Sequence, residues 1–248
     1  PFLVKQPVTK ADKQDKQAPD GTPRQQGERV LLPGASLRGR LRSQAERILR
    51  TLGCPVAQGH DVPPVKDCRS PDPATLLFGA AGWRGVLRTA ACLGVEPLRP
   101  VDHDMLAIDR FTGGGKDGAK FKLRYAECPT LQGSLDVELE RLRGAHLDGA
   151  HDDDVSWIAL GLLTLVLRDL DEGDIAFGYG RAKGYGRCRA QDLLNQWRSH
   201  LHSSFGPDAD TKALAALRSW CAAQATGPIE AQTPLGADTC ATPAAFRP

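Results

Sequence analysis

The sequence is poor in aromatic residues, in net charge and in long apolar runs. Phe, Trp and Tyr together make up 6% of its 248 residues. Its 32 Lys and Arg nearly balance 30 Asp and Glu, so the formal net charge is only +2. This balance does not by itself indicate a nucleic-acid-binding protein, and such a function would have to come from locally clustered cations. Hydrophobic residues still reach 41%, enough for one large domain or two small ones.

No apolar run approaches the roughly 20 residues that span a bilayer. The longest, Trp157 to Leu167, is broken by Gly161 and Thr164 and therefore predicts a buried helix. We find no signal peptide, so we expect a cytoplasmic protein without membrane contact. The sequence starts at Pro1 with an apolar run already under way, which suggests a processed chain or a piece of a longer polypeptide.

The 26 glycines and 18 prolines predict many turns and long loops. Ser36 is expected to cap the first helix and Gly53 to end it. We expect strands at 30–32, 85–93, 175–177 and 187–190, a long β-hairpin within 101–142, a short apolar segment at 74–79, and helices at 36–52, 155–170, 193–201 and 211–225. We divide the chain into one domain at 1–190 and a helical and linker tail at 191–248.

A glycine-rich segment runs from Gly178 to Arg189 with the sequence GYGRAKGYGRCR. Its glycines allow the backbone to approach a ligand closely and to expose amide groups. Its cations can neutralise phosphates, and Tyr179 and Tyr185 can stack on bases. The Lys-Ser/Thr pair of a Walker loop is missing, and the segment does not fit a dinucleotide fingerprint. A solvated hairpin without a ligand is the alternative.

A second cationic segment is the helix expected after Pro33-Gly34. It carries five arginines within 13 residues, namely Arg38, Arg40, Arg42, Arg47 and Arg50. Its N-terminus also offers free amides and a positive dipole end, which suit a phosphate. A run of charges on a helix can equally be a solvated face, so this segment alone does not decide whether the helix binds a phosphate.

Three segments occur in one order along the chain: LPGASLRG from Leu32, IDRFTGG from Ile108, and the glycine-rich segment from Gly178. This order resembles the RAMP superfamily, and in particular the backbone subunits of type III CRISPR effectors, including those found as fused multi-domain polypeptides. A fourth family-like segment is Leu76 to Gly79. The resemblance covers about residues 1–190.

The resemblance implies an α+β fold with a ferredoxin-like (RRM-like) core and a long hairpin that forms a thumb. It implies that guide RNA lies across a basic face, that target RNA pairs with it, and that other subunits or modules complete the ribonucleoprotein. The guide backbone would be held by Ser36, Arg38, Arg42, Lys183, Gly184, Tyr185 and Arg187. The segment from Asp109 to Lys120, which includes Arg110, would belong to the thumb.

Some members of this family cut target RNA with an aspartate that precedes the Pro-Gly-Ser motif. A carboxylate there can position the attacking 2′-hydroxyl, usually with a divalent ion such as Mg2+. The corresponding loop contains Asp12, Asp15 and Asp20. Asp15 and Asp20 are our catalytic candidates, and a solvated loop acid is the alternative for each.

The seven cysteines are odd in number and irregularly spaced, which favours metal binding or burial over a disulfide framework. Cys54, His60 and Cys68 supply three candidate zinc ligands in a short loop. Fused effectors of the resembled family often carry a zinc knuckle at this point. The fourth ligand is open between Asp61, Asp67, Asp72 and Cys92, and plain buried cysteines are the alternative to Zn2+.

Two other functions compete with a guide-binding module. One is a stand-alone endoribonuclease that cuts the CRISPR precursor RNA, in which Tyr185 or His103 would act as the acid–base group. The other is a generic RRM-like RNA-binding protein, which the shortage of aromatic residues disfavours.

Overall fold

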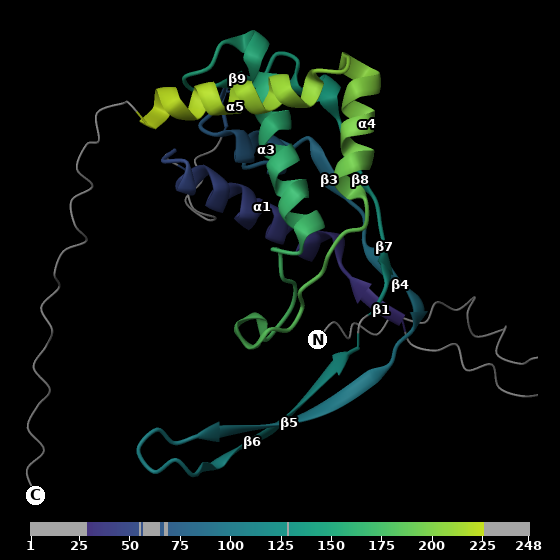
Figure 1. Ribbon diagram of the computed structural model, residues 1–248. Coiled ribbons are helices and arrows are strands. Elements are labelled where there is room, and N and C mark those ends of the chain that lie inside the picture. The colour runs from purple at the N-terminus through teal and green to yellow at the C-terminus, as the bar shows by residue number, and fades with distance from the viewer. Residues whose placement is uncertain (1–28, 55, 57–64, 67–68, 128, 226–248) are drawn as a thin grey trace, which may run out of the picture.

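The computed structural model describes residues 29–54, 56, 65–66, 69–127 and 129–225 (Figure 1). Several sequence predictions fall outside these residues: the loop at 5–28 with Asp15 and Asp20, the candidate ligands His60 and Cys68, and the end of the chain after 225.

Helix α1 (Gly34–Thr51) follows strand β1 (Arg29–Leu32) and buries one face, which carries Leu37, Leu41, Ala45 and Leu49. The prediction that Ser36 caps this helix is wrong. The helix begins two residues earlier, after Pro33, and no side chain caps it. At its first residue, Gly34, the helix packs closely against strand β3 (Leu87–Thr89): Thr89 donates a hydrogen bond of 2.9 Å to the Gly34 carbonyl, and a Cβ on Gly34 would clash with the Thr89 carbonyl oxygen.

The sheets are small. Strands β1, β4 (Cys92–Pro97) and β7 (Leu131–Gln132) form one antiparallel sheet in the order β1-β4-β7. Strand β3 (Leu87–Thr89) pairs antiparallel with β8 (Leu135–Val137), and β2 (Arg69–Ser70) pairs parallel with β9 (His146–Leu147). The expected strand at 85–93 is therefore divided between β3 and β4, and each half has a different partner.

Helix α3 (Asp152–Glu172) is the centre of the core, as its apolar run predicts. Three aspartates in its first turn stabilise the helix by interacting with the positive end of its dipole. Gly173, in a left-handed conformation, ends the helix. Helices α1 and α2 (Pro73–Phe78) pack on one part of α3, and α4 (Leu193–Phe205) and α5 (Ala209–Ala225) pack on another. The predicted division at residue 190 stays a prediction, but α5, which lies beyond it, contributes Leu217, Trp220 and Cys221 to the core.

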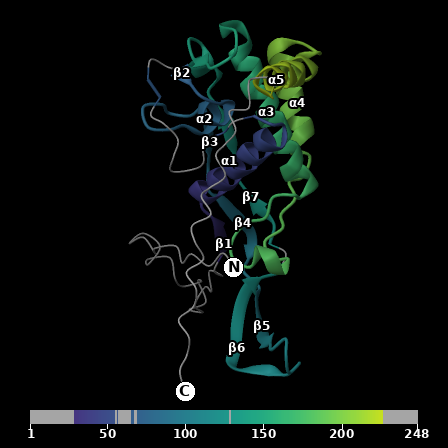
Figure 2. The same cartoon turned by 90° about the vertical axis from the view of Figure 1, so that its left-hand side faces the viewer.

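A long β-hairpin projects away from this core (Figures 1 and 2). Its strands are β5 (Pro100–Ile108) and β6 (Gly115–Ala126), paired from Pro100↔Ala126 to Ile108↔Gly115. The predicted hairpin is confirmed for this part. It is wrong beyond residue 126, because β7 and β8 pair with β4 and β3 and residues 139–142 form a 3-10 turn, η3.

The expected strands at 175–177 and 187–190 meet only at an isolated bridge between Ala176 and Arg187. The architecture is thus a mixed α/β fold with small, mostly antiparallel sheets. These ladders do not by themselves define a ferredoxin-like core, which stays a prediction. None of the helices in the described part of the chain is long and apolar enough to cross a membrane.

Candidate nucleic-acid interface

The segment 178–189 folds into a compact loop that we call the glycine loop. Gly178, Gly180, Gly184 and Gly186 all have positive φ angles, between 77° and 83°. The loop is closed by a hydrogen bond of 2.8 Å from the Phe177 amide to the Gly186 carbonyl, and it contains a 3-10 turn, η4 (Arg181–Lys183). At Gly186 a Cβ would clash with the Phe177 carbonyl oxygen, so only glycine fits this closure.

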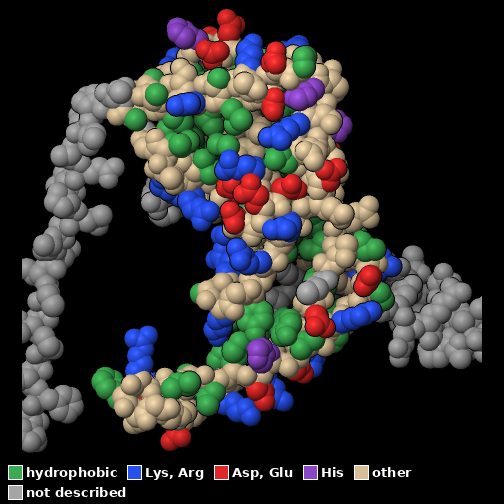
Figure 3. All heavy atoms as spheres, in the orientation of Figure 1, with side chains coloured by type: hydrophobic (Ala, Val, Ile, Leu, Met, Phe, Trp, Pro, Cys, Tyr) green, Lys and Arg blue, Asp and Glu red, His purple; other side chains and the backbone are tan. Residues whose placement is uncertain are grey.

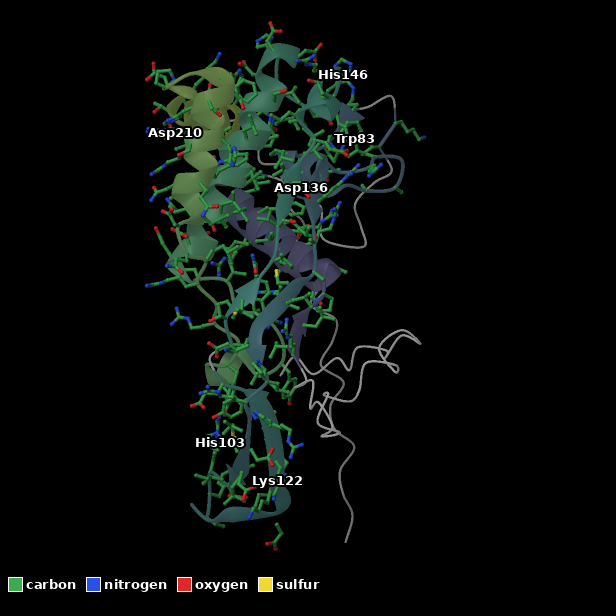
Figure 4. All side chains as sticks on the ribbon, turned by 90° about the vertical axis from the view of Figure 1, so that its right-hand side faces the viewer. Trp83, His103, Lys122, Asp136, His146 and Asp210 are labelled. Carbon is green, nitrogen blue, oxygen red and sulfur yellow. The ribbon has the colours of Figure 1, made fainter. Side chains whose placement is uncertain are left out.

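The glycine loop lies against the base of the hairpin. The hydroxyl of Tyr185 is 2.8 Å from Nδ1 of His103 on β5, and the Tyr185 ring is 5.2 Å, centroid to centroid, from that of Tyr125 on β6. The ammonium of Lys183 lies 4.5 Å from the ring centroid of Phe121, a cation–π distance. Figure 4 shows His103 and Lys122 on the hairpin, at the opposite end of the molecule from His146 and Asp210. Two predicted RNA-binding residues, Lys183 and Tyr185, are therefore held by hairpin side chains.

Cations also connect the glycine loop with α1. Arg40 donates a hydrogen bond of 3.0 Å from Nε to the carbonyl of Ala176, next to the loop. Partial burial, and then the charges of Arg181 and Arg47, lower the pKa of Arg40. In Figure 3, Lys and Arg side chains gather along the left edge between α1 and the glycine loop. Repulsion between like charges on such an edge is relieved when an anion binds there.

Arg38 and Arg42 on α1 are turned toward the protein. Arg38 donates to the carbonyls of Leu87 and Phe78, at 2.6 and 2.5 Å, and Arg42 donates to the carbonyl of Gly79 at 2.7 Å. These bonds tie α1 to the end of α2 and to β3. The predicted guide contacts of Arg38 and Arg42 stay predictions, and each side chain also has this structural task. Ser36 is exposed in the first turn of the helix, where an RNA phosphate could reach it.

The tip of the hairpin presents Arg110 and Phe111 to solvent, and the Phe111 side chain is 99% exposed. The turn is fixed by Asp109, whose carboxylate accepts hydrogen bonds from the amides of Phe111 and Thr112, at 2.7 and 3.1 Å. These two hydrogen bonds lower the pKa of Asp109, and the bond from the Thr112 amide has the larger effect. Arg110 is thus part of the interface only if a ligand extends along the hairpin.

The comparisons with known proteins identify the family. The model of the RAMP superfamily matches residues 14–189. This chain belongs to the RAMP superfamily. No curated protein matches it. Among solved structures, this RAMP chain is similar to a chain of a "CRISPR RNA-guided surveillance complex" at 13% identity, covering 72% of this chain and 73% of the other, with a TM-score of 0.41. At that level of similarity two chains need not share a function.

Of the three zinc-ligand candidates of this RAMP chain, only Cys54 lies within the described residues. Its side chain is buried at the end of α1, beside Cys221 of α5. A hydrogen bond from the Cys221 thiol lowers the pKa of Cys54, and the same bond together with burial raises that of Cys221. A lowered thiol pKa favours the thiolate that binds zinc. A zinc site of Cys54, His60 and Cys68 stays a prediction.

Sequence reasoning missed the two hairpin residues that support the glycine loop, Phe121 and Tyr125. They lie four positions apart on β6, so they share one face of the strand. That alternation is visible in the sequence, but nothing in it indicates that the partner of this face lies some 60 residues later in the RAMP chain. The sequence suggests a role for His103 only in the competing endoribonuclease.

Proposed function

We propose that this chain binds CRISPR guide RNA as a backbone module of a type III effector and positions or cleaves complementary target RNA. Membership of the RAMP superfamily and the order of the segments at Leu32, Ile108 and Gly178 support this proposal. Guide RNA, target RNA and other subunits of the same ribonucleoprotein would be its partners.

One observation carries the proposal: the glycine loop lies against the hairpin base and beside α1, so that cations of the loop and of the helix share one region. Lys183 and Arg181 come from the loop, and Arg40 and Arg47 come from α1. Phosphates of an extended RNA strand could follow this track, because each phosphate neutralised by Lys or Arg releases condensed counterions. The positive-φ glycines keep the loop backbone free of side chains that would hold a strand away.

Guide-length RNA that copurifies with the chain tests the proposal. The chain should be expressed with a CRISPR array and its partner subunits, and the bound nucleic acid should be extracted and sequenced. Short RNAs of uniform length with array-derived sequence are the expected result. A heterogeneous pool of cellular RNA would instead favour a generic RNA-binding protein, and no RNA would contradict both functions.

The contact between Tyr185 and His103 favours a second candidate, an endoribonuclease that cuts the precursor RNA without a metal. With 2.8 Å between the Tyr185 hydroxyl oxygen and Nδ1, the imidazole is oriented by one ring nitrogen, and Nε2 is left to take the proton of an attacking 2′-hydroxyl. The attack forms a 2′,3′-cyclic phosphate and breaks the P–O5′ bond, and the 5′-oxygen of the next nucleotide leaves as a hydroxyl with a proton from water. Cleavage of precursor RNA in EDTA that is lost in His103→Ala would establish this activity, and intact RNA after long incubation would exclude it.

A further inference from the structure

Two of the chain's three tyrosines meet at the joint between the glycine loop and the base of the hairpin, and the third lies on the same loop. Tyr179 and Tyr185 belong to the loop and Tyr125 to β6. The ring of His103 lies 6.4 Å from that of Tyr125 and 6.5 Å from that of Tyr185, again between centroids. The joint is therefore a cluster of aromatic rings in a chain that has few of them.

These rings are not part of the hydrophobic core. Tyr179 is 63% exposed, His103 is exposed, and Tyr125 and Tyr185 are half-buried. The core is instead mainly aliphatic, built from Leu, Ile and Val on α1, α2 and α3. Packing of the interior therefore does not explain why tyrosine is concentrated here.

The glycine loop that carries two of these rings also carries cations. Lys183 lies over the exposed ring of Phe121, and Arg181 and Arg187 are exposed on the same loop. Ring faces beside a cationic track are how proteins bind unpaired nucleotides: bases stack on the rings, and the cations neutralise the phosphates.

We propose that this joint is a stacking site for an unpaired nucleobase, with Tyr185 and Tyr125 as the stacking rings. His103 is a positioning residue, since its bond to the Tyr185 hydroxyl fixes that ring. The inference rests on the proposed RNA-binding function. It identifies the place where the protein holds the RNA by a base and not by its backbone. The alternative is that the rings only hold the glycine loop on the hairpin and present its cations.

Binding of two single-stranded RNAs by the full-length chain separates these roles. The RNAs have equal length and equal numbers of phosphates, but one carries abasic residues in its centre. Wild type should bind the ordinary RNA more tightly. Tyr185→Leu should weaken binding of the ordinary RNA about five- to a hundredfold, the range for one stacked base, and leave the abasic RNA unchanged. Tyr185→Phe, which keeps the ring, should retain most of the preference.

Phe205→Leu is the matched control, because it removes a partly exposed ring that packs on Trp157 at the other end of the molecule. It should change neither affinity. Equal weakening of both RNAs by Tyr185→Leu would show that the rings only position the loop, and would overturn the stacking site while leaving RNA binding in place. If wild type binds neither RNA, the proposed function fails and the stacking site with it. Thermal unfolding of each variant confirms that it is folded.

Discussion

Gln44 on α1 donates a hydrogen bond from its side-chain amide to the carboxylate of Asp169 on α3, with 2.5 Å between Nε2 and Oδ2. Both side chains are buried, and Arg168 supplies a second bond to the same carboxylate at 3.2 Å. The pair fixes α1 against the central helix. Because α1 also carries Arg40 and Arg47, this buried contact determines where the cationic edge lies relative to the glycine loop.

Gln44→Leu should lower the free energy of unfolding by about 1–3 kcal/mol, because the buried carboxylate of Asp169 loses a donor while the side-chain volume is kept. Urea denaturation measures the change. The double variant Gln44→Leu/Asp169→Leu should recover part of the loss, since it removes the unpaired group. Equal stability of the single variant and wild type would show that Arg168 or water satisfies Asp169 unaided.

Arg38 and Arg47 should respond differently to replacement by glutamine. Arg38→Gln removes the donor of two backbone carbonyls and should cost about 1–3 kcal/mol of stability. Arg47 is exposed, so Arg47→Gln should leave stability within about 0.5 kcal/mol but weaken RNA binding. Unfolding curves and RNA titrations of both variants test the contrast. If Arg38→Gln is as stable as wild type and only its RNA affinity falls, the bonds of Arg38 to Phe78 and Leu87 contribute nothing to the stability of the fold.

Charge reversal of Lys183 and Arg187 together should weaken RNA binding and flatten its dependence on salt. For single strands the slope of log K against log salt should fall by about 0.7 for each phosphate that the loop no longer neutralises. Lys212→Glu/Arg218→Glu makes the same change of charge on exposed residues of α5 and is the control. An unchanged slope in the loop variant would place the phosphates elsewhere.

Purified protein should contain about one zinc per chain, the stoichiometry of a closed structural site. Cys54→Ser or Cys68→Ser should lose the metal and lower the melting temperature, whereas Cys188→Ser, with a half-buried thiol on the glycine loop, should keep it. Elemental analysis measures the metal. If wild type contains no zinc and Cys54→Ser is as stable as wild type, Cys54 is only a buried hydrogen-bond partner of Cys221.

Target cleavage is tested by Asp15→Ala and Asp20→Ala in the assembled effector, with complementary RNA and magnesium. A catalytic carboxylate or its bound metal must lie within reach of the attacking 2′-hydroxyl. Loss of one cut with guide and target binding intact is the expected result for the active residue. If both variants retain the full cleavage pattern, this module positions the target and the catalytic acids belong to neighbouring modules.

The sequence predicts those elements whose signal is local. Helix α3 follows from one apolar run, and α1 from apolar residues at helical spacing. The strands are harder, because residues 131–142 alternate like a hairpin strand but form β7, β8 and the 3-10 turn η3, and the two strands have partners far along the chain. The site shows the same limit. The glycine loop can be recognised from its composition, whereas the contact of Tyr185 with His103 joins residues 82 positions apart and depends on the fold.

The hairpin must also avoid pairing its edge strands with those of a second molecule. Among the described strands, β5 and β6 pair only with each other, so each has an open edge with unsatisfied backbone groups. Such edges invite strand addition from a second molecule and eventually aggregation. Charged residues line both strands, including Asp102, Asp104, Lys116, Lys120 and Lys122. Bringing another chain alongside would desolvate these charges, so they protect the free hairpin from aggregation.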